Sequence, residues 1–100
     1  MSAKPFAFHK DAGLEVEAAF AWYMAHSRNA AVAFMDELEQ ALASIQDAPH
    51  RWPLFEGCFR RYLLRRFPFY IVYRETDQSI EVIALAHGRR RPGYWRVRTM

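Results

Sequence analysis

The chain has 100 residues, of which 52% are hydrophobic and 25% charged, a composition typical of a single globular domain. It has no run of the roughly 18 apolar residues that a membrane span requires, no signal-peptide pattern at its start, and one cysteine, so an internal disulfide is excluded. Four basic residues stand against eight acidic ones up to Glu56, whereas ten arginines stand against three acidic residues from Gly57 onward, which together give the net charge of +3. We therefore expect one cytoplasmic domain, residues 1–100, with no membrane association and with a second half suited to phosphate or carboxylate groups.

The first half of the chain predicts one short strand and two helices. Lys4–His9 is expected to form a strand, with two phenylalanines on one side. Asp11 is a residue type favoured as a helix cap, and apolar residues at helical spacing predict a helix over about residues 12–26. Ser27 can cap a second helix with an apolar stripe of period 3.6 and with Asp36, Glu37 and Glu39 facing water; the stripe contains Ala31, Phe34, Met35, Leu38, Ala41, Leu42 and Ile45. Because the connection is short, the two helices should form an antiparallel hairpin.

The second half predicts three strands. Pro49 and Pro53 end the helical region, since proline lacks the amide hydrogen that a helix requires. Strands are then expected over Phe59–Phe67, Phe69–Glu75 and Ser79–His87, joined by short turns as an antiparallel meander. The apolar run in the last strand favours a central position. The predicted fold class is α+β: a short N-terminal strand and an antiparallel helix hairpin packed on a three-stranded antiparallel meander.

The sequence predicts neither a metal site nor a cofactor. The four histidines lie far apart, with no pair at metal-ligand spacing, and there is only one cysteine. No glycine-rich phosphate loop or nucleophile-elbow motif is present.

Arginines on the first meander strand and after the last strand are the main candidates for a binding site. If the meander brings them together, they form a basic surface that attracts phosphate or another acidic partner, with Tyr94 and Trp95 available to stack beside it. A solvated strand face and aromatic side chains packed on the core are the alternatives. The candidate binding residues are Arg61, Arg65, Arg66, Arg89 and Arg91.

His87 has two interpretations. At the end of a strand and beside arginines, it could carry a proton near neutral pH while the arginines stabilise charge on a phosphate. Alternatively, it is a half-buried strand residue whose ring nitrogen meets a backbone carbonyl.

Two stretches, "RRFPFYIVYR" (65–74) and "VIALAHGRRRPGYW" (82–95), resemble the RelE/ParE superfamily of bacterial toxins, especially the plasmid stabilisation branch. The resemblance implies the toxin of a type II toxin-antitoxin system, held in a hetero-oligomer by a cognate antitoxin encoded beside it. RelE-like members cut messenger RNA on the ribosome, whereas ParE-like members poison DNA gyrase and need no ribonuclease residues.

For a ribonuclease, the resemblance implies Arg65 or Arg66 and Arg90 at the phosphate, with His87 or Tyr94 for proton transfer. RelE-like ribonucleases use lysines on the basic strand, however, and this chain has no lysine after Lys10. The histidine-tyrosine pair of another ribonuclease branch is replaced here by His87 and Gly88. We therefore expect a ParE-like toxin that is not an enzyme and acts on gyrase; a ribosome-dependent messenger RNA endoribonuclease and a non-toxic binding module are the alternatives.

An antitoxin segment that is disordered alone could fold as it wraps around this chain, with an apolar helix on the helix hairpin or a strand added to the sheet. The candidate contact residues are Phe20, Trp22, Trp52 and Phe55, for which core packing is the alternative. The functional hypothesis requires Arg65, Arg66 and Arg90 to share one neighbourhood.

Overall fold

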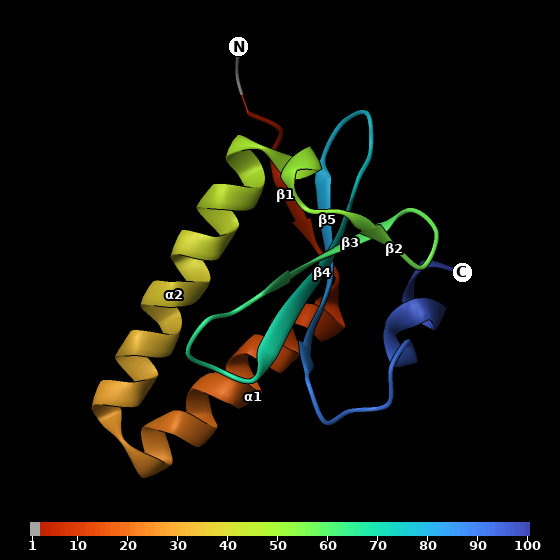
Figure 1. Cartoon of the computed structure of the whole chain (residues 1–100). Helices are drawn as coiled ribbons and strands as arrows, with labels where there is room; N and C mark the ends of the chain where they lie inside the picture. The colour runs from red at the N-terminus through yellow and green to blue at the C-terminus, as the bar shows by residue number, and fades with distance from the viewer. Residues whose placement is uncertain (1–2) are drawn as a thin grey trace.

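The computed structural model describes residues 3–100 as two helices and a five-stranded sheet with two short 3-10 helices (Figure 1). The helices and strands are β1 Phe6–Phe8, α1 Lys10–His26, α2 Arg28–Asp47, β2 Leu54–Phe55, β3 Phe59–Leu63, β4 Phe69–Glu75 and β5 Ile80–His87. The 3-10 helices are η1 Pro49–Arg51 and η2 Tyr94–Thr99.

The strands form one mixed sheet in the order β1-β5-β4-β3-β2. β1 runs parallel to β5, and the other neighbouring strands are antiparallel. The predicted meander is therefore confirmed as β3-β4-β5, with β5 between β1 and β4 as its apolar sequence indicated. β2 was not predicted, because a strand of two residues is too short to show an alternating pattern.

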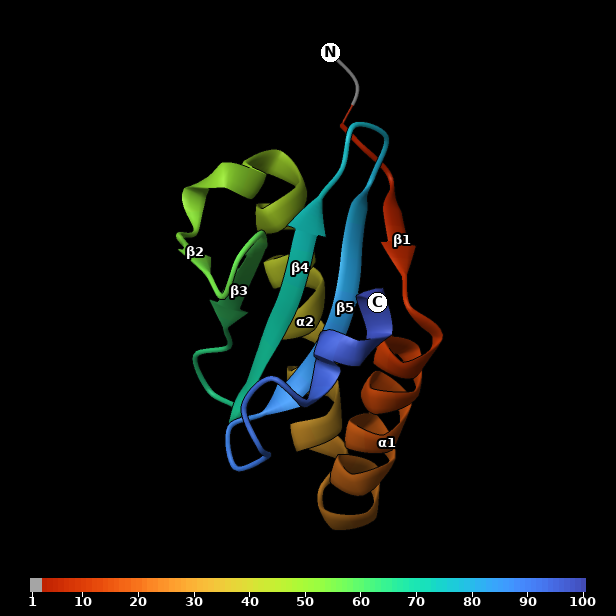
Figure 2. The same cartoon turned by 90° about the vertical axis from the view of Figure 1, so that its right-hand side faces the viewer.

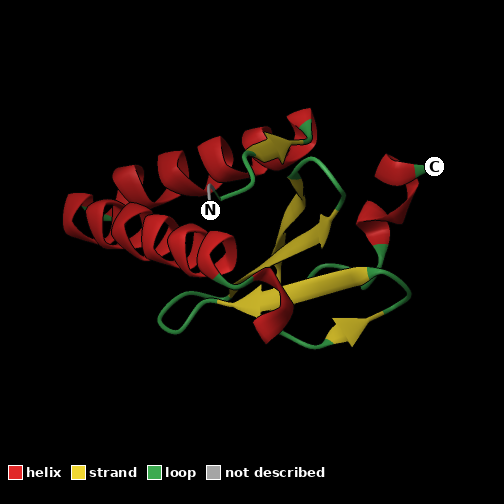
Figure 3. Cartoon of the chain, turned by 90° about the horizontal axis from the view of Figure 1, so that it is seen from above, coloured by secondary structure: helices red, strands yellow, loops and turns green. Residues whose placement is uncertain are grey.

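The helix hairpin covers one face of the sheet, and η2 lies against the other (Figures 2 and 3). On the helix side, α2 buries its apolar stripe, including Phe34 and Ile45, against the β-strand residues Ile71 and Leu85. On the opposite side, Trp95 of η2 is completely buried in a second cluster with Phe59, Val72, Ile83, Ala84 and Ala86. The predicted α+β class is confirmed, and burial on both sheet faces explains why β5 is apolar throughout its middle.

The two helices begin differently from each other. α1 starts at Lys10, two residues earlier than expected, and its cap is His9, whose Nδ1 accepts a hydrogen bond of 3.1 Å from the Asp11 N–H. The prediction of Asp11 as the cap was wrong, because the chain leaves β1 directly into the helix. The cap at Ser27 is confirmed: its hydroxyl oxygen accepts from the Ala30 N–H at 3.2 Å.

The first meander strand ends earlier than predicted. β3 stops at Leu63, and the Leu64 N–H donates to the Phe69 carbonyl to close a turn. Arg65 and Arg66 therefore lie in the β3–β4 turn and do not alternate along a strand. The reason is Glu37, which was expected to face water but is 8% exposed and accepts hydrogen bonds from the backbone N–H groups of both arginines.

Among residues 3–100, neither helix is long and apolar enough to cross a membrane.

Candidate functional site

A groove with a volume of about 470 Å³ lies between α1 and the C-terminal end of β5, and we call it the α1–β5 groove. Its walls are mostly apolar or aromatic and include Ala18, Ala19, Trp22, Tyr23, Phe69 and Leu85. Its polar lining residues are Glu15, His87 and Arg90. An apolar groove with a few polar groups at its edge is the usual form of a site that receives another molecule.

Helix α1 leaves large apolar side chains in solvent beside this groove. The Trp22 side chain is 58% exposed and stacks on the ring of His26, with 3.9 Å between ring centroids. Leu14 and Met24 are also exposed on α1, although neither lines the groove and the charged residue Glu17 is exposed on the same helix. Because an exposed apolar surface next to a groove commonly contacts a partner protein, α1 is the first place to look for one.

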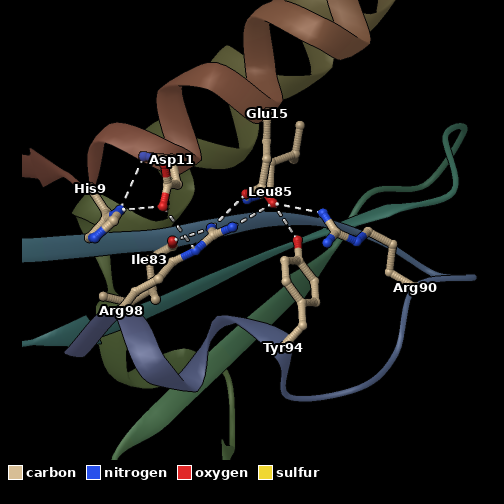
Figure 4. Close-up of polar contacts among 8 residues, drawn as sticks. All are labelled: His9, Asp11, Glu15, Ile83, Leu85, Arg90, Tyr94 and Arg98. Atoms are coloured by element: carbon tan, nitrogen blue, oxygen red, sulfur yellow. Dashed lines mark hydrogen bonds and ion pairs between the residues drawn. The ribbon is translucent and has the colours of Figure 1, made fainter. Parts of the chain in front are cut away.

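The carboxylate of Glu15, on the groove wall, joins α1 to β5 and to the C-terminal segment (Figure 4). Its Oε1 accepts from the Leu85 N–H at 3.0 Å, and the Arg98 guanidinium donates to both oxygens at 2.8 and 2.9 Å. Oε2 also accepts from the Tyr94 hydroxyl, and Arg90 Nη1 lies 3.5 Å from it. This carboxylate is therefore fully occupied by groups of the chain itself.

Tyr94 and Arg90 lie against each other at the rim of the groove. The Arg90 guanidinium carbon is 3.7 Å from the centre of the Tyr94 ring, a cation–π contact. Burial and the hydrogen bond to Glu15 raise the pKa of Tyr94 well above its ordinary value of 10.0. The phenol therefore stays protonated at neutral pH and donates a hydrogen bond to the Glu15 carboxylate.

His87 lies at the same rim, with its ring edge-on to Phe69. Its Nδ1 accepts a hydrogen bond of 3.0 Å from the Arg89 N–H, which helps to shape the turn after β5. The alternative interpretation of a part-buried strand residue is thus met in part: the ring nitrogen contacts the backbone, but its partner is an N–H group and not the expected carbonyl.

The β3–β4 turn has a second carboxylate at its centre. Burial opposes ionisation of Glu37, but hydrogen bonds from the Arg65 N–H, the Arg66 guanidinium and the Arg66 N–H outweigh it and lower the pKa of Glu37. Arg65 and Arg66 also line a polar pocket beside α2 together with Tyr62, Gln40 and Ser44. The exposed Arg65 side chain is available to an acidic group that enters this pocket.

The basic residues predicted to converge lie at the same end of the sheet but face different helices. The Gly88 N–H donates to the Pro68 carbonyl at 2.8 Å, so the β3–β4 turn and the segment after β5 are adjacent. Arg66, however, pairs with Glu37 of α2 at 3.1 Å, whereas Arg90 pairs with Glu15 of α1.

The remaining predicted binding arginines are dispersed. Arg61 lies over the rings of Phe55 and Tyr70 on the η2 side of the sheet. Arg89 and Arg91 are exposed in the loop after β5. A binding role for these arginines remains a prediction.

The four aromatic residues predicted to contact an antitoxin do not share one groove. Trp22 lines the α1–β5 groove, and Phe20 is exposed on the same helix. Trp52 packs on the helix-side core and on Tyr62, and Phe55 packs on Trp95 across the sheet. For Trp52 and Phe55 the structure therefore shows the core packing that was their alternative.

Sequence reasoning missed Glu15 and Glu37, the two carboxylates that organise the site. Each is one acidic residue among several on a helix, and neither belongs to a motif, so no local signal distinguished them. Within residues 3–100, no group of three or more histidine, cysteine or acidic side chains is placed to hold a metal ion.

The fold matches that of a solved structure from a toxin-antitoxin system. The chain superposes on a solved structure described as the chromosomal ParDE toxin-antitoxin system from P. aeruginosa, with a TM-score of 0.73 over 85% of this chain and 96% of that one. The two are 15% identical, so this match shows the shared fold alone.

Sequence comparison then places the chain in a family. Residues 6–92 match the family described as the ParE toxin of the type II toxin-antitoxin system, parDE, and the chain belongs to this family. It is 41% identical over 49 residues to Toxin ParE2 of two Mycobacterium tuberculosis strains, CDC 1551 and H37Rv. That match covers 48% of this chain, and the chain spans about half the length of these relatives, 46%. The predicted superfamily and the ParE type are thus confirmed.

Proposed function

We propose that this chain is a growth-arresting toxin that acts on DNA gyrase, is not an enzyme, and is neutralised by a cognate antitoxin. Family membership supports the toxin role, and the P. aeruginosa ParDE structure is described as a toxin-antitoxin system. The bonding of Tyr94 bears on the ribonuclease alternative: its hydroxyl donates a hydrogen bond to Glu15, and its pKa is raised. A phenol held in this way is a poor proton carrier at neutral pH, which disfavours the ribonuclease alternative.

The ribonuclease alternative has one observation in its favour. His87 and Arg90 line the same groove, and Arg90 contacts Tyr94, so the three residues proposed for RNA cleavage do lie together. Controlled induction of the chain in bacteria without antitoxin separates the mechanisms. A DNA-damage response with intact messages supports gyrase, and truncated messages without that response support the ribosome.

Purified gyrase provides the direct test. The chain should block supercoiling or trap cleaved DNA, and His87→Ala should retain this activity, because the proposed mechanism uses no proton transfer at His87. An unaffected gyrase at saturating toxin refutes the gyrase target. Unchanged growth on induction, with full-length protein present, would leave only the non-toxic binding module.

The α1–β5 groove is the proposed antitoxin site. Trp22 and Phe69 offer an apolar surface, while Arg90 and His87 at the rim and the neighbouring Arg89 and Arg91 favour an acidic segment. Glu15 does not oppose such a segment, because its charge is compensated by Arg98. The predicted partner segment is therefore acidic, with an apolar side chain that enters the groove.

A pair of tryptophan and leucine substitutions tests this site. Trp22→Ala should weaken binding of the protein encoded beside the toxin by at least about tenfold, as expected for an aromatic anchor. Leu54→Ala is a matched control, because Leu54 is 57% exposed but lies outside the groove. Equal affinities of both variants and the unmodified chain in calorimetry would refute the groove as the antitoxin site.

A further inference from the structure

Among residues 3–100, no strand pairs with the end of β5 on the side of β1, and Glu15 binds the backbone there. β1 pairs with β5 only from Phe6–Ile80 to Phe8–Val82, after which the chain turns into α1. Beyond Val82, residues 83–86 of β5 are buried, and backbone groups there that lack a strand neighbour are costly unless another group pairs with them. Glu15 accepts from the Leu85 N–H, and Arg98 Nη1 donates to the Ile83 carbonyl at 2.9 Å. The ion pair of Glu15 with Arg98 thus takes the place of a neighbouring strand.

The same pair attaches the C-terminal segment to the sheet. An ionised carboxylate offers about four acceptor positions, and Glu15 uses them for Leu85, for two bonds from Arg98, and for the Tyr94 hydroxyl (Figure 4). The Glu15 and Arg98 side chains are 15% and 11% exposed, so water competes weakly for these bonds. Tyr94, bound in this way, supports the guanidinium of Arg90 on its ring.

We propose that Glu15 is a positioning residue: its carboxylate holds the arginine-rich segment 88–100 against β5 in the orientation needed to engage the toxin's target. The role of this orientation in engaging the target rests on the proposed function. The attachment of segment 88–100 by Glu15 does not. Two other anchors should keep the segment attached without Glu15, namely the buried Trp95 and the ion pair of Arg96 with Glu56. Loss of Glu15 therefore changes the orientation of the segment and leaves the fold intact.

Glu15→Gln is the most selective change. Glutamine keeps the size of the side chain but has one acceptor oxygen, and its amide group would face donors from Arg98 or Tyr94. Glu15→Ala removes both oxygens. Glu17→Gln is the matched control, because Glu17 is exposed two residues further along the same helix and lines none of the described pockets.

Two measurements on these variants test the proposal. Amide hydrogen exchange of residues 94–99 should be faster by about tenfold or more in Glu15→Gln and Glu15→Ala and unchanged in Glu17→Gln. Growth arrest on induction at equal protein level should be weakened by a similar factor in both Glu15 variants only. Ile45→Val separates orientation from stability, because Ile45 is completely buried in the helix-side core, whereas Trp95 and Tyr94 of the segment belong to the other cluster. This variant should lose stability and still arrest growth.

The outcomes are distinguishable. If the unmodified chain does not arrest growth, the proposed function fails, and exchange alone decides the positioning role. Unchanged exchange of residues 94–99 in both Glu15 variants overturns the proposal. The proposal is also overturned if Ile45→Val and Glu15→Gln have the same melting temperature and weaken growth arrest equally. In that case, loss of growth arrest would follow overall stability.

Discussion

Glu37→Gln should destabilise the folded chain and should do so in a pH-dependent way. The carboxylate of Glu37 on α2 accepts from the Arg65 N–H, from the Arg66 N–H at 3.3 Å, and from Arg66 Nε at 3.1 Å. Hydrogen bonds to a charged group contribute about 1.5–3 kcal/mol, against about 0.5–1.5 kcal/mol for neutral pairs. The Arg66 side chain is 63% exposed, so its contribution is screened by solvent and the backbone bonds dominate. We expect a loss of about 1–3 kcal/mol at pH 7.

The pH dependence follows from the lowered pKa of Glu37. Its ordinary value is 4.5, and hydrogen bonds in the folded chain hold it lower despite burial. A carboxyl group with a lowered pKa binds more protons in the unfolded chain as pH falls, so folding loses stability in that range. The Glu37 contribution is therefore complete above pH 4.5 and is lost as pH falls through the value in the folded chain. The difference between Glu37→Gln and the unmodified chain should shrink over the same range.

Urea denaturation followed by circular dichroism at several pH values measures both effects. Glu39→Gln is the control, because Glu39 is exposed on the same helix, and it should change the free energy of unfolding by less than about 0.5 kcal/mol. A Glu37→Gln protein as stable as the unmodified chain at pH 7 would contradict the assigned role of this carboxylate. A loss that stays constant down to pH 3 would contradict the assigned cause.

Substitutions at three further positions test the packing and the helices by thermal or urea denaturation. Trp95→Ala should cost about 3–5 kcal/mol because the side chain is completely buried, whereas Trp95→Phe should cost less than about 1.5 kcal/mol, since it also removes an indole N–H buried without a partner; equal losses would show that the cluster does not depend on ring volume. Ser27→Ala should cost about 1 kcal/mol and Ser27→Asp close to none, because aspartate preserves the cap of α2; a neutral alanine would argue against the bond to Ala30. Gly13→Ala should stabilise α1 by about 0.5–1 kcal/mol, because an added methyl group meets open space in a helix; destabilisation would indicate an unseen contact.

Elements with a strong local pattern were predictable from the sequence. The period of 3.6 in α2 located its buried stripe, and Ser27 located its start. The run of apolar residues in β5 indicated a central strand because such a strand is buried on both faces. Elements that depend on distant partners were not predictable. Strand β3 ends at Leu63 because the Glu37 carboxylate on α2 accepts hydrogen bonds from the Arg65 and Arg66 N–H groups. No residue close in sequence indicates this pairing.

The site follows the same division. The arginine-rich second half and the motifs over residues 65–74 and 82–95 indicated the toxin class without any structure. Which charges meet was decided only by the tertiary structure: Glu15 binds Arg98 across 83 positions of the chain, and Glu37 binds the Arg65 amide across 28. The sequence by itself determined the second helix, the central strand, the charge asymmetry and the family, because periodicity, composition and short motifs are local properties. The partners of a buried carboxylate depend on which distant residues the packed fold places next to it. Glu15 on α1 and Glu37 on α2, which bind different arginines, were therefore identified only in the folded chain.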